Sequence, residues 1–196
     1  MKMNYSNLLP FVAKSPLLAA VFLLCSCGNR KASAQKITDT PATTVKPSMD
    51  IHSAVVRGNL EVIKQHLAAG TNINEKDPFG GSSPLISASL FGKTEIAKLL
   101  IDAGADINVQ NNDGSTALHT AAFFCRPEIV KMLLVKKADK NIKNKYGATP
   151  GQSVAESFEA VKPTYEMLEK LLAPMGLKLD YVYIEKTRPE IAALLK

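Results

Sequence analysis

One six-residue pattern returns in this chain at a fixed spacing. It begins at Ser83, Thr116 and Thr149, and each start lies 33 residues after the one before. A period of this length is typical of a solenoid, in which each unit buries its apolar face only against its neighbours. The repeat therefore predicts an elongated array of helices, and it directs the search for function towards a binding surface rather than a reaction.

The second half of each unit predicts an amphipathic helix. In one unit Ile96, Leu99 and Leu100 are spaced i, i+3 and i+4, which places them on one helical face. Residues 128–134 repeat the same spacing one period later. Gly104 follows the earlier helix, as glycine does at a helix C-cap. Each unit is thus expected to be a pair of helices followed by a turn-rich segment.

These units resemble the ankyrin repeat. The matching positions are Pro84, Leu85, Ala88, Gly92, Leu99, Leu100, Gly104, Ala105 and Asp106 in one unit, and Thr116, Leu118, His119, Ala121, Leu133 and Leu134 in the next. The resemblance implies an all-α fold over residues 50–196. We expect a solenoid of about four helix pairs plus a C-terminal capping helix pair, with short turn fingers between them.

The chain departs from the family pattern at three places. Cys125 stands at the position of the inter-helix glycine, so its backbone is expected either to be strained or to avoid the left-handed conformation. Residues 136–138 replace the glycine at the next helix end. In the fourth unit Gly151 takes a leucine position, and extra residues within 156–163 are expected to separate the two helices.

The C-terminal tail echoes an earlier unit. Residues 188–191, Arg-Pro-Glu-Ile, repeat residues 126–129, and Thr187 with Glu190 fits a capping box. We therefore expect residues 180–196 to form the capping helix pair.

The N-terminus has different chemistry. Lys2 and Lys14 precede an apolar run at residues 17–24, which is shorter than the roughly 20 residues of a membrane-spanning helix. This pattern is typical of a secretion signal. The following Leu-Cys-Ser-Cys resembles a bacterial lipobox, which implies a signal peptide at residues 1–26 and a lipid on Cys27. The alternative is an ordinary signal peptide with incidental cysteines.

Residues 27–49 are rich in Ser, Thr and Pro and are expected to form a flexible tether. The predicted location is the bacterial cell envelope. Gly28 offers no inner-membrane retention signal, which favours the outer membrane, facing the periplasm, over the inner membrane.

The charge is unevenly distributed. The chain carries a net +6, but residues 50–196 hold 18 basic and 17 acidic residues, so the basic excess belongs mainly to the N-terminal part. A nucleic-acid-binding domain usually shows a basic footprint on the folded domain itself. We therefore expect no nucleic-acid partner.

His119 and Cys125 are the candidates for catalysis. The family resemblance instead implies that His119 hydrogen-bonds the backbone of a neighbouring turn, and the sequence positions no general base beside Cys125. No histidine stands at metal-ligand spacing. We expect a protein without enzymatic activity, cofactor or metal. The alternatives are an enzyme or toxin-like effector that uses Cys125 and His119, and a structural protein whose lysines at 131–145 grip anionic surfaces.

The resemblance implies a cupped binding surface, with turn tips as fingers and first helices as the palm. Phe79 and Tyr146, at two tips, are the expected aromatic anchors. The palm pairs Leu90-Phe91 and Phe123-Phe124 are each expected to expose one member. The full set of expected partner-binding residues is Lys76, Asp77, Phe79, Leu90, Phe91, Asn112, Asp113, Phe123, Phe124, Lys145 and Tyr146. The sequence thus predicts a lipid-anchored monomer that binds a partner protein.

Overall fold

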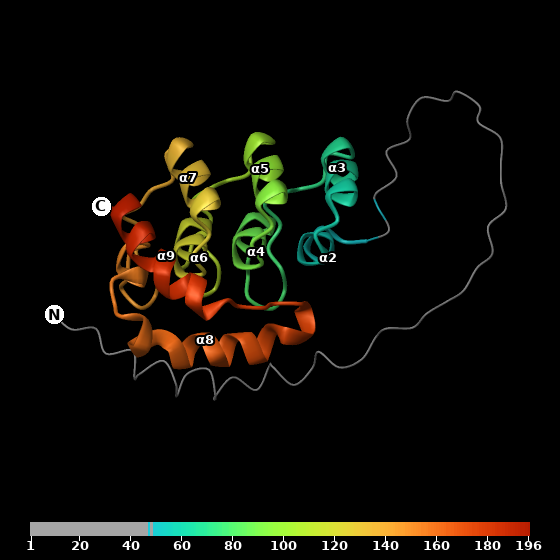
Figure 1. The fold of residues 1–196 in the computed structure, drawn as a ribbon. Coiled ribbons are helices and arrows are strands. Elements are labelled where there is room, and N and C mark those ends of the chain that lie inside the picture. The colour runs from blue at the N-terminus through green and yellow to red at the C-terminus, as the bar shows by residue number, and fades with distance from the viewer. Residues whose placement is uncertain (1–46, 48) are drawn as a thin grey trace, which may run out of the picture. The chain divides into compact units, whose positions relative to one another are not determined.

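The computed structural model describes residue 47 and residues 49–196. The predicted signal peptide, Cys27 and nearly all of the tether lie outside these residues. Within them the regular elements are eight α-helices and two short 3-10 helices (Figure 1). None of the helices in this part of the chain is long and apolar enough to cross a membrane.

Three helix pairs follow one another, as the repeat predicted. They are α2 (Ile51–Arg57) with α3 (Leu60–Ala68), α4 (Pro84–Leu90) with α5 (Thr94–Asp102), and α6 (Ala117–Phe123) with α7 (Pro127–Val135). The first helices form one row and the second helices form another (Figure 1). Between the rows of the last two pairs lies an aliphatic core whose residues recur at the 33-residue spacing, such as Leu85 with Leu118 and Leu100 with Leu133.

The start of each first helix is set by its cap. Ser83 and Thr116 have extended backbones, and the hydroxyl of each accepts a hydrogen bond from the N–H three residues later, both at 3.4 Å. Such caps satisfy one of the N–H groups that a helix leaves unpaired. Pro84 occupies the first turn, where its missing N–H costs nothing.

Cys125 and Lys137 replace glycines of the family pattern, but both keep the left-handed backbone conformation that is typical of glycine. Cys125 has φ 53° and Lys137 has φ 63°, while Gly92 and Gly104 at the equivalent turns have φ 63° and 84°. Cys125 therefore does not avoid the left-handed conformation. A side chain in this region costs on the order of 1–2 kcal/mol, so the turn geometry is retained in spite of the substituted residues.

The fourth unit is split. Its first helix is reduced to η3 (Gln152–Val154), which contacts α6, and its second-helix position is taken by the end of α9 (Tyr181–Leu194), which contacts α7 and η3. Ile191 and Leu195 of this segment are buried, four residues apart like Ile129 and Leu133. The similarity of residues 188–191 to residues 126–129 therefore reflects equivalent helices, but it marks the second helix of the fourth unit rather than a fifth unit.

The C-terminal part thus differs from the expected capping helix pair. Pro127 follows Thr116 by 11 residues, whereas Pro189 follows Thr149 by 40, so the fourth unit is 29 residues longer. The expected capping box at Thr187 is absent from this segment. Thr187 is buried inside α9, whose N-cap is Asp180, and the Asp180 carboxylate accepts from the Tyr183 N–H at 3.0 Å.

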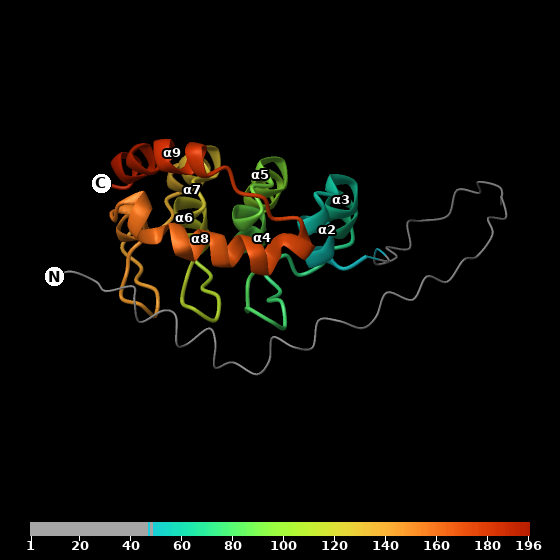
Figure 2. The ribbon, with the colours of Figure 1, turned by 60° about the horizontal axis from the view of Figure 1, so that its bottom comes forward.

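We call residues 156–187 the insert. It contains α8 (Phe158–Leu172), η4 (Ala173–Met175) and the first half of α9. The residues expected to separate two helices lie largely inside α8, Pro163 included. Figures 1 and 2 both show α8 running along the array beside α6 and α4. The chain then returns to α9 through a turn where the Glu169 carboxylate accepts from the Leu179 N–H and the Tyr181 hydroxyl.

Candidate partner-binding surface

Each finger is shaped by one side chain that caps its own loop. The Asp77 carboxylate accepts from the N–H groups of Phe79, Gly80 and Ser82 at 2.9, 2.7 and 2.6 Å. Asn111 and Asn144 do the same in the next two fingers, each accepting from the N–H groups two and four residues later. Such side-chain turns hold a loop in one conformation without regular secondary structure.

Neighbouring fingers are also bonded to one another. The Asn112 N–H donates to the Gly80 carbonyl at 2.9 Å, and the Lys145 N–H donates to the Asp113 carbonyl at 2.8 Å. The Lys76 ammonium adds a bond of 2.7 Å to the carbonyl of Gln110. Because each finger is tied both internally and to the next, the three tips form a preorganised row.

Two aromatic side chains stand out from this row. Phe79, in the first finger, is 71% exposed, and Tyr146, in the third, is 40% exposed. Tyr146 also lies near the Asp113 carboxylate of the neighbouring finger, and partial burial together with this carboxylate raises the pKa of its hydroxyl. Large exposed aromatic side chains on a rigid support are the residues that most often anchor a protein partner.

The structure brings Lys76, Asn112, Asp113 and Lys145 together in this row, as expected from the sequence. Asp77 has a different role, because its carboxylate is occupied by the loop's own N–H groups. Sequence reasoning named Asn112 but missed Asn111. The spacing Asn111–Asn144, which equals the repeat period, is the signal that would have identified this structural position.

The palm differs from expectation at both of its residue pairs, Leu90-Phe91 and Phe123-Phe124. None of the four side chains is exposed: Leu90, Phe91 and Phe123 are partly buried and Phe124 is buried. At the third unit the reason is the insert, because Tyr165 of α8 stacks on Phe123 with ring centroids 4.6 Å apart. The expectation of one exposed member per pair is therefore wrong.

Cys125 and Arg188 lie under the insert. Cys125 is fully buried, and the loss of hydration raises the pKa of its thiol to about 11. Arg188 is also buried and donates to the Tyr165 hydroxyl at 2.8 Å and to the Glu156 carbonyl at 2.9 Å. Because a reactive cysteine needs an accessible thiolate, this environment gives Cys125 a packing role.

His119 has the structural role that the family resemblance implies. Its Nδ1 lies 2.9 Å from the Thr116 hydroxyl and accepts from the Thr116 N–H at 3.2 Å, and its Nε2 lies 3.0 Å from the Ala148 carbonyl. Burial lowers the pKa of the imidazole. Nδ1 thus completes the cap of its own helix, and Nε2 joins the third unit to the next turn.

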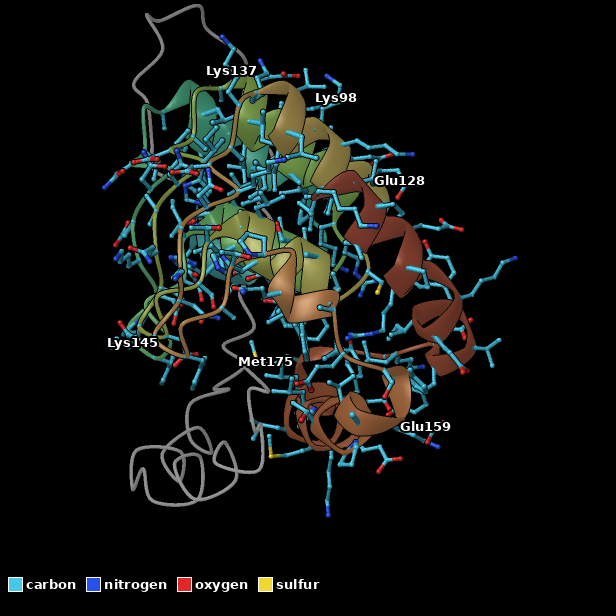
Figure 3. The ribbon with its side chains drawn as sticks, turned by 90° about the vertical axis from the view of Figure 1, so that its left-hand side faces the viewer. Lys98, Glu128, Lys137, Lys145, Glu159 and Met175 are labelled. Carbon is cyan, nitrogen blue, oxygen red and sulfur yellow. The ribbon has the colours of Figure 1, made fainter. Side chains whose placement is uncertain are left out.

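The lysines between 131 and 145 do not form one patch. All six are exposed. Figure 3 shows Lys137 beside the second helices, near Lys98, and Lys145 at the far end of the fingers. Lys136 lies 3.7 Å from the Asp102 carboxylate of the preceding unit. A single anion-gripping surface built from this segment is not supported by this arrangement.

Comparison with known proteins agrees with this architecture. Residues 51–144 match the family "Ankyrin repeats (3 copies)". Human protein phosphatase 1 regulatory subunit 27 is 40% identical over 73 residues, covering 36% of this chain and 47% of that protein. Human DNA-binding protein RFXANK is 36% identical over 74 residues, covering 38% of this chain and 28% of that protein. The chain thus spans less than half the length of these relatives.

A solved structure is similar as well. The ankyrin repeat domain of Bcl-3, described as a unique member of the IkappaB protein family, superposes with a TM-score of 0.52 at 31% identity, covering 59% of this chain and 50% of that one. The family match, the helix pairs and the fingers agree with one another. Residues 51–144 therefore match the ankyrin-repeat family, and the described part of the chain has an all-helical ankyrin-repeat fold.

Proposed function

We propose that this chain is a non-catalytic module that binds a partner protein through its finger row. The observation that carries the proposal is the pair of exposed aromatic side chains, Phe79 and Tyr146, on fingers that are already bonded into one conformation. A preorganised surface loses little conformational freedom on binding, so more of the contact energy appears as affinity.

The similar proteins support this class of function without naming a partner. One relative is, by its name, a regulatory subunit of a phosphatase, and its match to this chain lies in the repeats. Regulatory subunits act by contact with another protein. The partner of this chain is proposed only as a protein that fits the finger row.

Site-specific cross-linking in intact cells tests this proposal. A photoreactive residue at position 79 is expected to give a discrete adduct with one protein. The same residue at position 98 is the control, because Lys98 is exposed on the second-helix row, away from the finger marked by Lys145 (Figure 3). The double variant Phe79→Ala, Tyr146→Ala should lose the partner while keeping its helical spectrum. Equal adducts at 79 and 98, or none at 79, would refute the proposal.

We also propose that the module is held at the bacterial envelope by a lipid on Cys27, in the outer membrane facing the periplasm. The support is the sequence alone, namely the apolar run at 17–24 and the lipobox-like residues 24–27. Cys27→Ala should move the protein from the membrane to the soluble fraction of lysed cells. Cys25→Ala is the matched control and should remain bound, so a membrane-bound Cys27→Ala variant would contradict the anchor.

A further inference from the structure

Part of the insert's apolar face lies outside the two core clusters of the described residues. Tyr165 is buried against the third unit, and Leu168 and Leu172 continue the same face of α8 at three and seven residues beyond it. Both leucines are only partly buried, and neither belongs to the two core clusters of the described residues. The C-terminal half of α8 therefore extends past the unit that anchors it.

A second apolar pair lies on the neighbouring unit. Leu90 and Phe91 end α4 at the positions that Phe123 and Phe124 take 33 residues later. They too are partly buried and outside both clusters. Tyr165 covers Phe123 in the third unit, whereas no equally buried side chain of α8 covers the second.

The dimensions place these two pairs at the same level of the array. Seven residues of helix, from Tyr165 to Leu172, advance by about 10 Å. Packed helices are about 8–10 Å apart, so this advance corresponds to one unit. Tyr165 stacks on Phe123 at the end of α6, and both views show α8 running beside α6 and then α4 (Figures 1 and 2). Leu172 is the last residue of α8, so it lies about one unit further along the array than Tyr165, at the level of α4. We call Leu90, Phe91, Leu168 and Leu172 the α4–α8 strip.

Two cations border the strip. A β-carbon at Gly92 would lie 2.9 Å from Cζ of Arg126, so the guanidinium rests directly on the turn that follows Phe91. Its Nη2 donates to the Leu90 carbonyl at 3.4 Å, and its Nε–H is buried without a hydrogen-bond partner. One unit earlier, Lys93 lies in the same way on Gly58, with Nζ 3.4 Å from the corresponding β-carbon position.

Neither cation has a carboxylate within ion-pair distance among the described residues, whose two ion pairs both involve Asp102. Burial lowers the pKa of Arg126, as expected for a charge that has lost water without gaining an anion. A partly buried guanidinium gains most from a bidentate carboxylate. The edge of the strip is therefore complementary to acidic groups about one unit apart.

We propose that the α4–α8 strip binds an acidic–apolar segment of a partner protein. Large apolar side chains of that segment lie between α4 and α8, and two carboxylates pair with Lys93 and Arg126. This inference rests on the proposed function as a protein-binding module, but it uses a surface other than the finger row. Phe79 and Tyr146 are not part of it.

Panning a library of random dodecapeptides on the purified full chain tests the inference. Enriched peptides should share two acidic residues that flank leucine, phenylalanine or methionine. A synthetic peptide of the enriched sequence should bind about tenfold more weakly to Arg126→Gln and to Leu172→Asp, by fluorescence anisotropy. Lys98→Gln, at an exposed lysine on α5, is the charge-matched control and should bind normally.

Two further variants separate this strip from folding defects and from the fingers. Arg126→Lys keeps the charge and should retain more binding than Arg126→Gln. The variant Phe79→Ala, Tyr146→Ala should bind the peptide unchanged even if it loses the cross-linked partner. No enrichment of acidic–apolar peptides, binding that ignores Arg126→Gln and Leu172→Asp, or a dimer of the chain that Leu172→Asp abolishes would each overturn the inference.

Discussion

The hydroxyl of Tyr165 donates a hydrogen bond of 2.5 Å to the carbonyl oxygen of Phe123, and the two rings stack with centroids 4.6 Å apart. The same hydroxyl accepts from Arg188 at 2.8 Å. One buried side chain thus joins the insert, the end of α6 and α9. The palm of the third unit is occupied by the chain's own helix, which leaves the fingers and the second unit for a partner.

Removing this hydroxyl should cost stability. Tyr165→Phe leaves the Phe123 carbonyl and one N–H of the buried Arg188 without their partner, so we expect the free energy of unfolding to fall by about 1–3 kcal/mol in urea. Tyr183→Phe, at a side chain that is 42% exposed, is the control and should change it by less than about 0.5 kcal/mol. Equal changes in the two variants would show that the Tyr165 hydroxyl does not tie the insert down.

The contact between Gly92 and Arg126 makes a second prediction. Gly92 and Gly104 both have left-handed backbones, but a β-carbon at Gly92 would meet the Arg126 guanidinium at 2.9 Å, whereas none at Gly104 would meet anything within 4 Å. Gly92→Ala should therefore destabilise the protein more than Gly104→Ala, by up to about 1 kcal/mol in urea unfolding, because the end of the Arg126 side chain must move off the turn. In an Arg126→Ala background, Gly92→Ala should destabilise the protein no more than Gly104→Ala does. If Gly92→Ala still costs more stability in that background, the contact with Arg126 is not the cause.

The helix pairs were predictable because their signals are local. The caps at Ser83 and Thr116, and the spacing of Ile96, Leu99 and Leu100, lie within one unit and fix each helix without reference to the rest of the chain. The finger row followed for the same reason. Its exposed aromatics, Phe79 and Tyr146, lie at tips where little core is available to bury them.

The arrangement of the C-terminal part was not predictable, because 29 extra residues separate the first and second helices of the fourth unit. Residues 188–191 carry the signal of a second helix, but nothing local says which first helix they belong to. Proline adds to the ambiguity. Pro127 lies in the first turn of α7, whereas Pro189 lies inside α9. A proline is favoured in the first turn of a helix, and inside a helix it removes one backbone hydrogen bond, so the proline alone does not show where a helix begins. The burial of Phe124 follows from this long-range arrangement.

Lys137 offers a stabilising substitution. Its φ of 63° is costly for a side chain, and the side chain is exposed, so Lys137→Gly should raise the free energy of unfolding by about 0.5–1 kcal/mol. Lys136→Gly is the matched control, because Lys136 is also exposed but has φ −84°, and this variant should be neutral or destabilised. If Lys137→Gly lost as much stability as Lys136→Gly, the left-handed backbone at Lys137 would not be a source of strain.

Burial of Cys125 makes stability depend on pH. The pKa of the thiol is raised from an ordinary 9.0 to about 11, because burial disfavours the thiolate. Between these two values the unfolded chain releases the proton and the folded chain keeps it, so the unfolded state binds fewer protons. The free energy of unfolding should therefore fall as the pH rises from about 9 towards 11, and the stabilising contribution is fully present below that range.

Comparison with Cys125→Ala isolates this contribution. The tyrosines also ionise at alkaline pH, but they do so in both proteins, and their effect cancels in the difference between the two unfolding curves. We expect that difference to shrink as the pH rises through the window and to be constant below it. The native thiol should also react slowly with Ellman's reagent at pH 8 in a Cys25→Ser, Cys27→Ser background, and fast in urea. A thiol that reacts at once in the native protein, or a difference that does not vary with pH, would mean that Cys125 is reachable from water and would restore it as a candidate nucleophile.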